Sequence, residues 1–115
     1  MELRDMIGKR ITAWAVKGDT VEATLDDRCV TLEGEGECCA SCWIEHADGI
    51  DPIGATISEI TVGGWKVLSD EDMEVSEQGF YVIRTDKGDI TLDLRLNHNG
   101  YYGGELVCTL RAEED

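Results

Sequence analysis

The sequence predicts an all-β or β-dominated fold: antiparallel hairpins in a barrel or a sandwich, with at most two short helices. In at least five segments apolar and polar residues alternate with a period of two, which is the period of a half-buried strand. Turn-forming Gly, Asp and Asn residues separate these segments. The 115 residues fit one domain, residues 1–115, which is long enough to bury a core without disulfides.

The first third of the chain predicts a short helical turn and three meandering strands. Apolar residues in Met1–Ile7 have helical spacing, and Gly8 would end the turn. The alternating or β-branched segments that follow are separated by Lys17-Gly18-Asp19 and by Asp26-Asp27. The predicted strands are Ile11–Val16, Val21–Leu25 and Arg28–Leu32.

A cysteine-rich strand, Ser41–Glu45, comes next. The Gly/Glu alternation from Glu33 forms strands and helices poorly, and Ala47-Asp48-Gly49 predicts a turn. Trp43 and Ile44 would then point to opposite faces, which predicts a central strand covered on both sides and makes both residues structural.

The second half predicts hairpins. Gly63-Gly64 is expected to form a bulge between two strand pieces, and Ser69–Glu77, rich in acids, is expected to be a solvent loop. The clearest hairpin places Leu92 and Leu94 on one inward face. The expected strands are Ala55–Val62, Trp65–Leu68, Phe80–Thr85, Ile90–Leu96 and Glu105–Arg111.

The charge is strongly acidic, with 25 Asp and Glu against 10 Lys and Arg, a formal net charge of −15. Such a field repels phosphates and anionic membranes and attracts cationic partners. Two interpretations remain open: a solvated acidic surface that keeps a small protein soluble, or an acidic face that competes with nucleic acid for a basic host protein. We therefore expect no direct nucleic-acid binding and no membrane association. A homo-oligomer stays open.

The pattern of the N-terminal residues and the number of cysteines both predict a cytoplasmic protein. The N-terminal residues show no signal-peptide pattern, and no window approaches a membrane span of about 20 apolar residues. Five cysteines, an odd number, favour reduced thiols in the cytoplasm, here the host cytoplasm.

Two hypotheses fit the cysteine strand: a metal or redox site, or cysteines that are simply packed or partly exposed. Cys38, Cys39, Cys42 and His46 are ligand types for tetrahedral zinc, and Cys39-x-x-Cys42 is also a redox spacing. No second ligand pair follows at the usual distance, and strand alternation separates the thiols. We expect packed or partly exposed thiols and no cofactor, and we expect Cys29 and Cys108 to be small core residues.

Catalytic motifs do not emerge from the sequence. There is no nucleophile elbow, phosphate loop or dinucleotide fingerprint. His46 and His98 are the general-base candidates near neutral pH, and a thiol with His98 would need the fold to assemble it. No catalytic residue is assigned.

The aromatic residues suggest a ligand-binding face. Adjacent aromatics on a strand point to opposite faces, so one of each pair must lie outside the core. An exposed tyrosine beside asparagine and histidine could stack on a small planar, nucleotide-like ligand; alternatively these residues cover one end of the fold. The candidates for this face are Tyr81, Asn97, His98, Asn99, Tyr101 and Tyr102. The acidic partner-binding candidates are Asp70, Glu71, Asp72 and Glu74.

Several motifs together resemble a family of small uncharacterised proteins of bacteriophages and prophages. They are Ile7-Gly8-Lys9-x-Ile11, Cys38-Cys39-x-Ser41-x-Trp43-Ile44-Glu45, Gly49, Ile53-Gly54, Phe80-Tyr81-x-x-x-Thr85-x-Lys87-Gly88-x-x-Thr91 and Asn99-Gly100-Tyr101-Tyr102-Gly103. The resemblance brings no activity. Cys42 and His46 depart from it, standing where the family tends to carry an aliphatic residue and an acid. A metal site that needs those two would not be common to the family.

These observations predict a non-enzymatic binder that antagonises or modulates a host system, as an inhibitor of CRISPR defence does. Its partner would be a host protein with a basic surface, for instance in defence or nucleic-acid handling. The alternatives are sequestration of a nucleotide-like ligand, and a metal- or thiol-dependent protein that uses the cysteine cluster.

Overall fold

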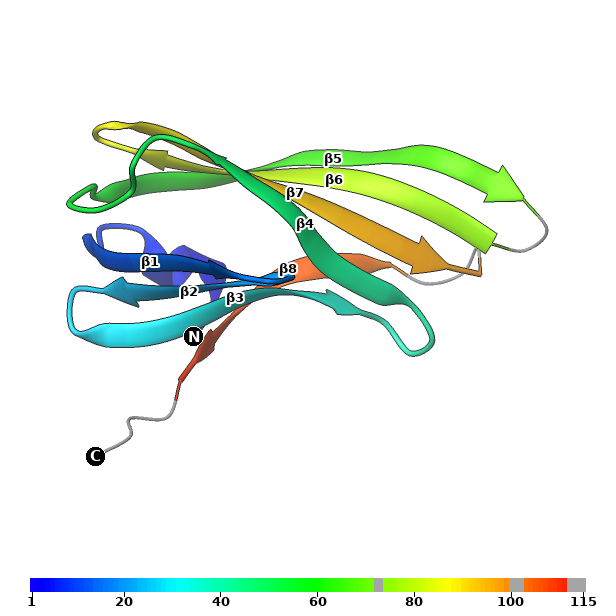
Figure 1. Cartoon of the computed structure of the whole chain (residues 1–115), viewed down its shortest axis with the longest axis horizontal. Coiled ribbons are helices and arrows are strands. Elements are labelled where there is room, and N and C mark those ends of the chain that lie inside the picture. Colours follow the sequence, from blue (N-terminus) through cyan, green and yellow to red (C-terminus); the bar gives the residue numbers. More distant parts are fainter. Residues whose placement is uncertain (72–73, 100–102, 112–115) are drawn as a thin grey trace.

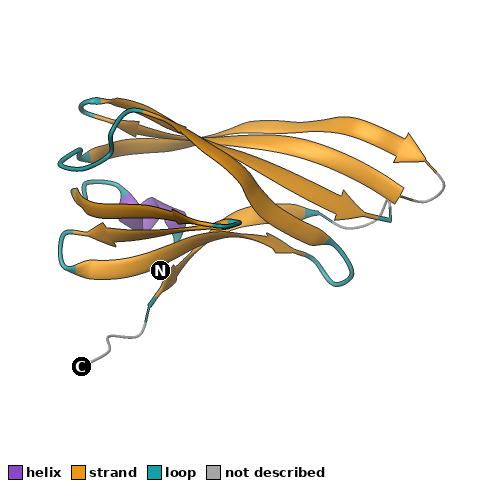
Figure 2. Ribbon diagram, viewed as in Figure 1, coloured by secondary structure: helices purple, strands orange, loops and turns teal. Residues whose placement is uncertain are grey.

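Two four-stranded antiparallel sheets face one another in the computed structural model (Figures 1 and 2). The model describes residues 1–71, 74–99 and 103–111. Strands make up 74% of it, and the only helix among these residues is a 3-10 turn, Leu3–Met6. The predicted β-dominated fold of antiparallel hairpins is confirmed, and of the two predicted forms, barrel and sandwich, it is the sandwich.

The first sheet has the order β1-β2-β3-β8. Its strands are β1 (Ile11–Lys17), β2 (Thr20–Leu25), β3 (Arg28–Gly36) and β8 (Gly104–Leu110). The Gly/Glu alternation, a poor strand former by its sequence, lies inside β3 and pairs with β8 up to Gly36 opposite Gly104. The reason is a close approach: a Cβ on Gly34 would lie 2.7 Å from the backbone nitrogen of Trp43, so glycine lets the next strand cross here.

The second sheet has the order β4-β7-β6-β5. Its strands are β4 (Ser41–Gly49), β5 (Ile57–Glu71), β6 (Glu74–Thr85) and β7 (Gly88–His98). The turn predicted at Ala47-Asp48-Gly49 is wrong, because β4 continues to Gly49, opposite Ile90. The predicted bulge at Gly63-Gly64 is present as a register shift between Val62 and Trp65.

The solvent loop predicted at Ser69–Glu77 is also wrong. β5 runs on to Glu71 and β6 begins at Glu74, so the described residues of this segment belong to paired strands, with Asp70 opposite Val75 and Glu71 opposite Glu74. Backbone pairing overrides the low strand propensity of the acids here.

The core lies between the sheets. Ile44, Leu92 and Leu94 are buried in it, while Trp43 is not a core member. The predicted central position of the cysteine strand is wrong, because β4 is an edge strand and Trp43 lies partly exposed on its outer face, opposite Arg95. Inward side chains of both sheets build the core, among them Val21, Leu25, Val30, Leu32, Ile57, Ile83, Ile90, Leu106 and Cys108.

Candidate functional site: the acidic end of the sandwich

Carboxylates gather where β3 and β5 finish and where β6 and β8 begin. The registers bring these strand ends together: β3 meets β8 at Gly36 and Gly104, and Asn97 of β7 lies between Ser41 of β4 and Ser76 of β6. We call this region the acidic end. Its described members are Glu35, Glu37, Glu105, Asp70, Glu71 and Glu74, all exposed.

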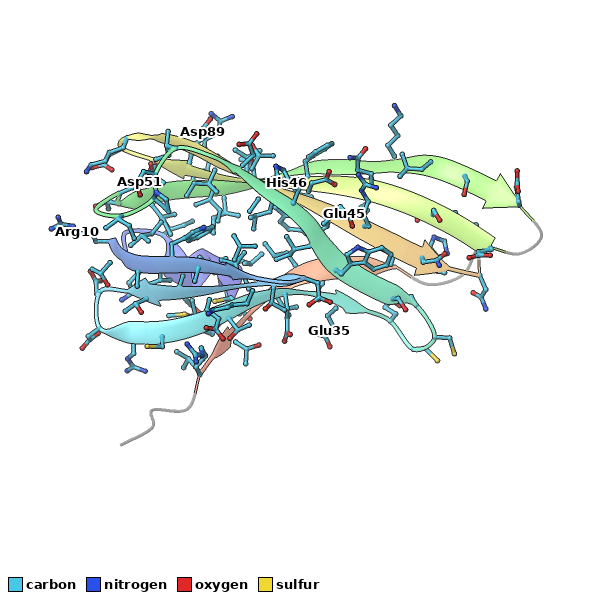
Figure 3. The ribbon with its side chains drawn as sticks, viewed as in Figure 1. Arg10, Glu35, Glu45, His46, Asp51 and Asp89 are labelled. Atoms are coloured by element: carbon cyan, nitrogen blue, oxygen red, sulfur yellow. The ribbon has the colours of Figure 1, made fainter. Side chains whose placement is uncertain are left out.

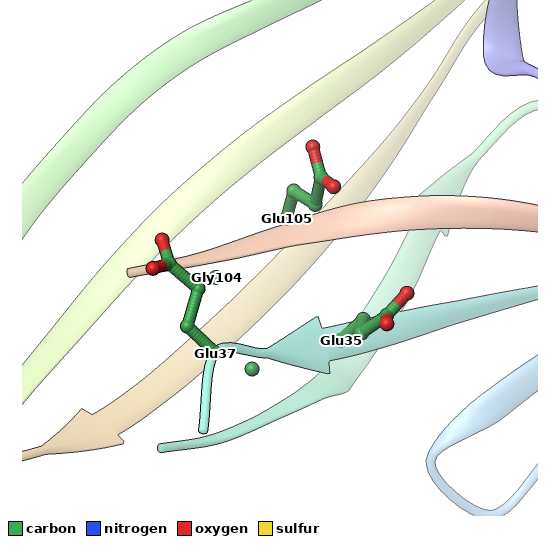
Figure 4. A pocket seen from close by; sticks show the side chains of 5 residues that line it. Glu35, Glu37, Gly104 and Glu105 are labelled. Atoms are coloured by element: carbon green, nitrogen blue, oxygen red, sulfur yellow. The ribbon is translucent and has the colours of Figure 1, made fainter. Parts of the chain in front are cut away.

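A hollow of about 300 Å³ lies at the acidic end, lined by Glu35, Gly36, Glu37, Gly104 and Glu105. Glu35 and Glu105 are direct cross-strand neighbours, an arrangement of like charges that destabilises a sheet. In Figure 4 the carboxylates of Glu35, Glu37 and Glu105 stand around the hollow and do not converge on one point. The geometry therefore suits a partner that presents several separate positive charges rather than one metal ion.

The acidic end also lacks counter-charges. In the described part of the chain no ion pair involves any of its six members. Of the two cations on adjoining strand segments, Arg95 binds Asp93 at 3.1 Å, and Lys66 is exposed opposite Gln78. Arg10 lies at the opposite end (Figure 3), where it and Lys87 both approach Gly54. The negative field at the acidic end is thus largely uncompensated.

An exposed apolar strip on β5 leads from Val62 toward the carboxylates at the end of this strand. Val62 and Val67 face inward by register, opposite Tyr81 and Glu77, yet on the edge strand β5 they are 55% and 53% exposed. Leu68, at the following bulge, is also exposed. In Figure 1 the β5–β6 hairpin extends beyond the strands of the other sheet. An exposed apolar patch bordered by charge is typical of a protein-binding surface.

The structure does not bring the predicted aromatic face together. Tyr81 is 5% exposed and points into the core, where burial raises the pKa of its hydroxyl. Its cross-strand neighbour is Leu92, five positions before Asn97, a separation of about 16 Å along the strand. Tyr81 is therefore corrected from ligand contact to core residue.

Three other predicted residues of that face, Asn97, His98 and Asn99, lie near the acidic end. The Asn97 amide donates to Glu74 at 3.3 Å, and His98 Nε2 lies 2.5 Å from a Glu77 carboxylate oxygen. Asn99 is exposed. Tyr101, Tyr102 and the acidic candidate Asp72 lie outside the described residues.

The four proposed metal ligands do not converge on one point, and of the four only Cys38 and Cys39 are neighbours. Cys38 and Cys39 occupy the turn between β3 and β4, Cys42 points inward opposite Leu96, and His46 points outward opposite Asp93. Burial raises the pKa of Cys42 to about 11. A bulge between Ile44 and His46 adds to the separation. Cys108 is buried as expected, but Cys29 is exposed, contrary to the prediction.

Sequence reasoning missed Glu35, Glu37 and Glu105 as a group. Alternation along β3 could have placed Glu33 and Glu35 on one face. Glu105 enters only through the pairing of β3 with β8, two strands far apart in sequence, and no local pattern announces that pairing.

Comparison with known proteins gives one match. A family model described as a domain of unknown function, DUF7448, matches residues 4–108. No curated protein and no solved structure matches the chain. Among the described residues, no helix has the length and apolar character to cross a membrane.

Proposed function

The chain belongs to the DUF7448 family, and from this premise, which brings no activity with it, we propose that the protein is a non-enzymatic binder. Its acidic end engages a basic surface on another protein. The observation that carries the proposal is the cross-strand pair Glu35–Glu105, two like charges held side by side without a described counter-ion.

Such a pair costs folding free energy, about 0.2–1 kcal/mol for one cross-strand contact. When a cationic partner binds, this unfavourable electrostatic energy would become favourable, because each carboxylate would then face an opposite charge. Complementary charge of this kind speeds association and selects the partner more than it adds affinity. The affinity itself would come from the apolar strip of Val62, Val67 and Leu68, whose burial removes exposed apolar area from water.

The finer proposal concerns the setting. The resemblance of several motifs to those of phage and prophage proteins, together with the charge, supports a protein that acts in an infected bacterial cell and occupies a host protein with a nucleic-acid-binding surface. A defence complex, including one of the CRISPR type, presents such a surface. The alternative of a nucleotide-like ligand has less support, because Tyr81 is buried away from Asn97.

The test is affinity capture from bacterial lysate at low and at physiological ionic strength. Wild-type protein is compared with the triple variant Glu35→Gln, Glu37→Gln, Glu105→Gln. We expect basic nucleic-acid-binding proteins to be retained by the wild type, to be released steeply as salt rises, and to be displaced by added DNA. The triple variant should lose them.

A matched control removes three negative charges at the opposite end: Asp26→Asn, Asp27→Asn, Asp51→Asn. The Asp26 and Asp51 carboxylates accept backbone hydrogen bonds from Arg10 and Ile53, which asparagine oxygens can also accept. This control should bind as the wild type does. Equal loss of binding in both triple variants would mean that overall charge matters and the acidic end does not, and the proposal would be wrong.

A further inference from the structure

The turn between β3 and β4 presents two adjacent thiols to solvent. It spans Glu37 to Ala40 and is closed by a hydrogen bond from the Ala40 N–H to the Glu37 carbonyl at 2.7 Å. Cys38 and Cys39 occupy its two central positions and are both exposed. Neither thiol contributes to the core, and neither belongs to the acidic end.

The backbone of this turn is strained at a cysteine. Cys38 has a φ of +38°, in the left-handed region that glycine adopts without cost. A non-glycine residue held there is strained, and such strain concentrates at functional sites. The conformation leaves the sulfur atoms of Cys38 and Cys39 only 3.3 Å apart.

The pair does not suit a direct sulfur–sulfur bond. A disulfide needs sulfurs about 2.05 Å apart and Cα atoms usually at least about 4.4 Å apart. Adjacent residues joined by a trans peptide, as Cys38 and Cys39 are, have Cα atoms only about 3.8 Å apart. A disulfide here would be strained and readily reduced, so the dithiol is the state that the turn favours.

A single bridging atom fits the pair better, and the separation selects its geometry. With bonds of about 2.3 Å to each sulfur, a spacing of 3.3 Å gives an angle of about 90° at the bridging centre. A tetrahedral ion would need sulfurs about 3.8 Å apart, and a linear one about 4.6 Å, for the same bond length. A pyramidal trivalent centre, with bond angles near a right angle, matches the observed spacing.

We propose that Cys38 and Cys39 form a vicinal dithiol site for trivalent arsenic compounds. For an arsenoxide, two arsenic–sulfur bonds form, the two thiol protons leave with the arsenoxide oxygen as one water molecule, and arsenic stays trivalent. No oxidant or reductant is consumed.

The surroundings favour this chemistry over thiolate chemistry. A hydrogen bond with Cys38 is the main cause that raises the pKa of the Cys39 thiol, and Glu37 adjoins the pair in sequence. The raised pKa favours the protonated Cys39 thiol, which supplies one of the two protons that the departing oxygen needs.

No other described pair of thiols offers the same geometry. Cys29 bonds at 3.6 Å with Thr24 on the first sheet, Cys42 faces the Glu105 carbonyl, and Cys108 is buried. Among the described residues no group of three or more His, Cys, Asp or Glu could hold a metal ion. The site consists of two ligands.

The experiment titrates reduced, full-length protein with phenylarsine oxide and follows the adduct by native mass spectrometry. We expect one tight equivalent, with the mass of the arsenoxide less one water, reversed by 2,3-dimercaptopropanol. Cys38→Ser and Cys39→Ser should each weaken binding by roughly 10²–10⁴-fold, the scale lost when a second tethered contact is removed. Cys29→Ser and Cys42→Ser are the matched controls and should bind as the wild type does.

Circular dichroism of each variant checks that the fold persists. If Cys38→Ser or Cys39→Ser is folded and binds as tightly as the wild type, or if the folded wild type forms no adduct, the site is refuted. An equal excess of zinc should leave the titration unchanged. If zinc prevents phenylarsine oxide from reacting with Cys38 and Cys39, the inferred preference for a bridging centre with a bond angle near 90° is refuted. The triple Gln variant of the acidic end should still bind phenylarsine oxide, so this result is independent of the proposed function.

Discussion

Trp65 lies directly on Gly79 of the neighbouring strand. The two are cross-strand partners, and a Cβ on Gly79 would meet indole atoms of Trp65 at 2.7 Å. The indole covers backbone that glycine leaves bare, a device by which sheets compensate a strand glycine. The contact comes just after the Gly63-Gly64 bulge, so it re-establishes the register of β5 on β6 and holds the hairpin that carries Asp70, Glu71 and Glu74.

We expect Gly79→Ala to lower the free energy of unfolding by about 1–3 kcal/mol, because the added methyl group overpacks against the indole. Urea denaturation measures this. Gly63→Ala is the control in the same hairpin, since its Cβ would meet Phe80 only at 3.4–3.5 Å, and it should cost less. In a Trp65→Ala background the penalty of Gly79→Ala should shrink; an unchanged penalty would show that the indole is not its cause.

Of the two large side chains of the cysteine strand, the smaller one, Ile44, should contribute more to the free energy of unfolding than Trp43. Ile44 is 2% exposed, whereas Trp43 lies partly exposed on the outer face, with its indole N–H donating to Glu45 at 2.8 Å. We expect Ile44→Ala to cost about 2–5 kcal/mol through loss of burial and cavity formation, and Trp43→Ala to cost less. Denaturant midpoints of the two variants decide; a larger loss for Trp43→Ala would contradict the edge position of β4.

Local sequence patterns predicted the strands whose side chains alternate strictly. Ile90–Leu96 is such a segment, and β7 contains it with Leu92 and Leu94 buried. The same local patterns gave wrong predictions where a segment forms a strand only because a neighbouring strand pairs with it or crosses it. The glycines of β3 are explained by the crossing of β4, and the acids of the β5–β6 hairpin by pairing between β5 and β6.

The candidate site was partly predictable for the same reason. Asp70, Glu71 and Glu74 stand out as a local cluster of acids in the sequence. Glu105 joins Glu35 only because β8 returns to pair with β3. Tyr81 was misplaced because alternation shows that one of Phe80 and Tyr81 is buried but does not show which one. In the structure Tyr81 is buried and Phe80 is 39% exposed.

The Glu35–Glu105 pair should respond to charge reversal. We expect Glu105→Lys to raise the free energy of unfolding by about 0.2–1 kcal/mol at low salt, because a repulsive cross-strand pair becomes attractive. The gain should diminish as salt rises. Glu59→Lys is the control, since Glu59 lies 3.8 Å from Arg84 and its reversal should destabilise. Thermal melts at two salt concentrations make the comparison; stabilisation by both variants would indicate relief of overall charge instead.

The burial of Cys42 should make the free energy of unfolding fall at alkaline pH. Burial raises the pKa of its thiol from the ordinary 9.0 to about 11 in the folded protein. The folded state therefore holds this proton more tightly than the unfolded state, so the contribution to stability is complete below about pH 9 and is lost as pH rises through about 11. Burial also raises the pKa of Cys108 and Tyr81, which adds to the alkaline loss in the same direction. Removal of one group should therefore make the pH dependence shallower without abolishing it.

We expect Cys42→Ala to lose less stability than the wild type between pH 8 and pH 11 in urea titrations, with Cys29→Ala, at an exposed site, as the control. Parallel pH profiles for wild type and Cys42→Ala would show that this thiol ionises in the folded protein as readily as in the unfolded chain.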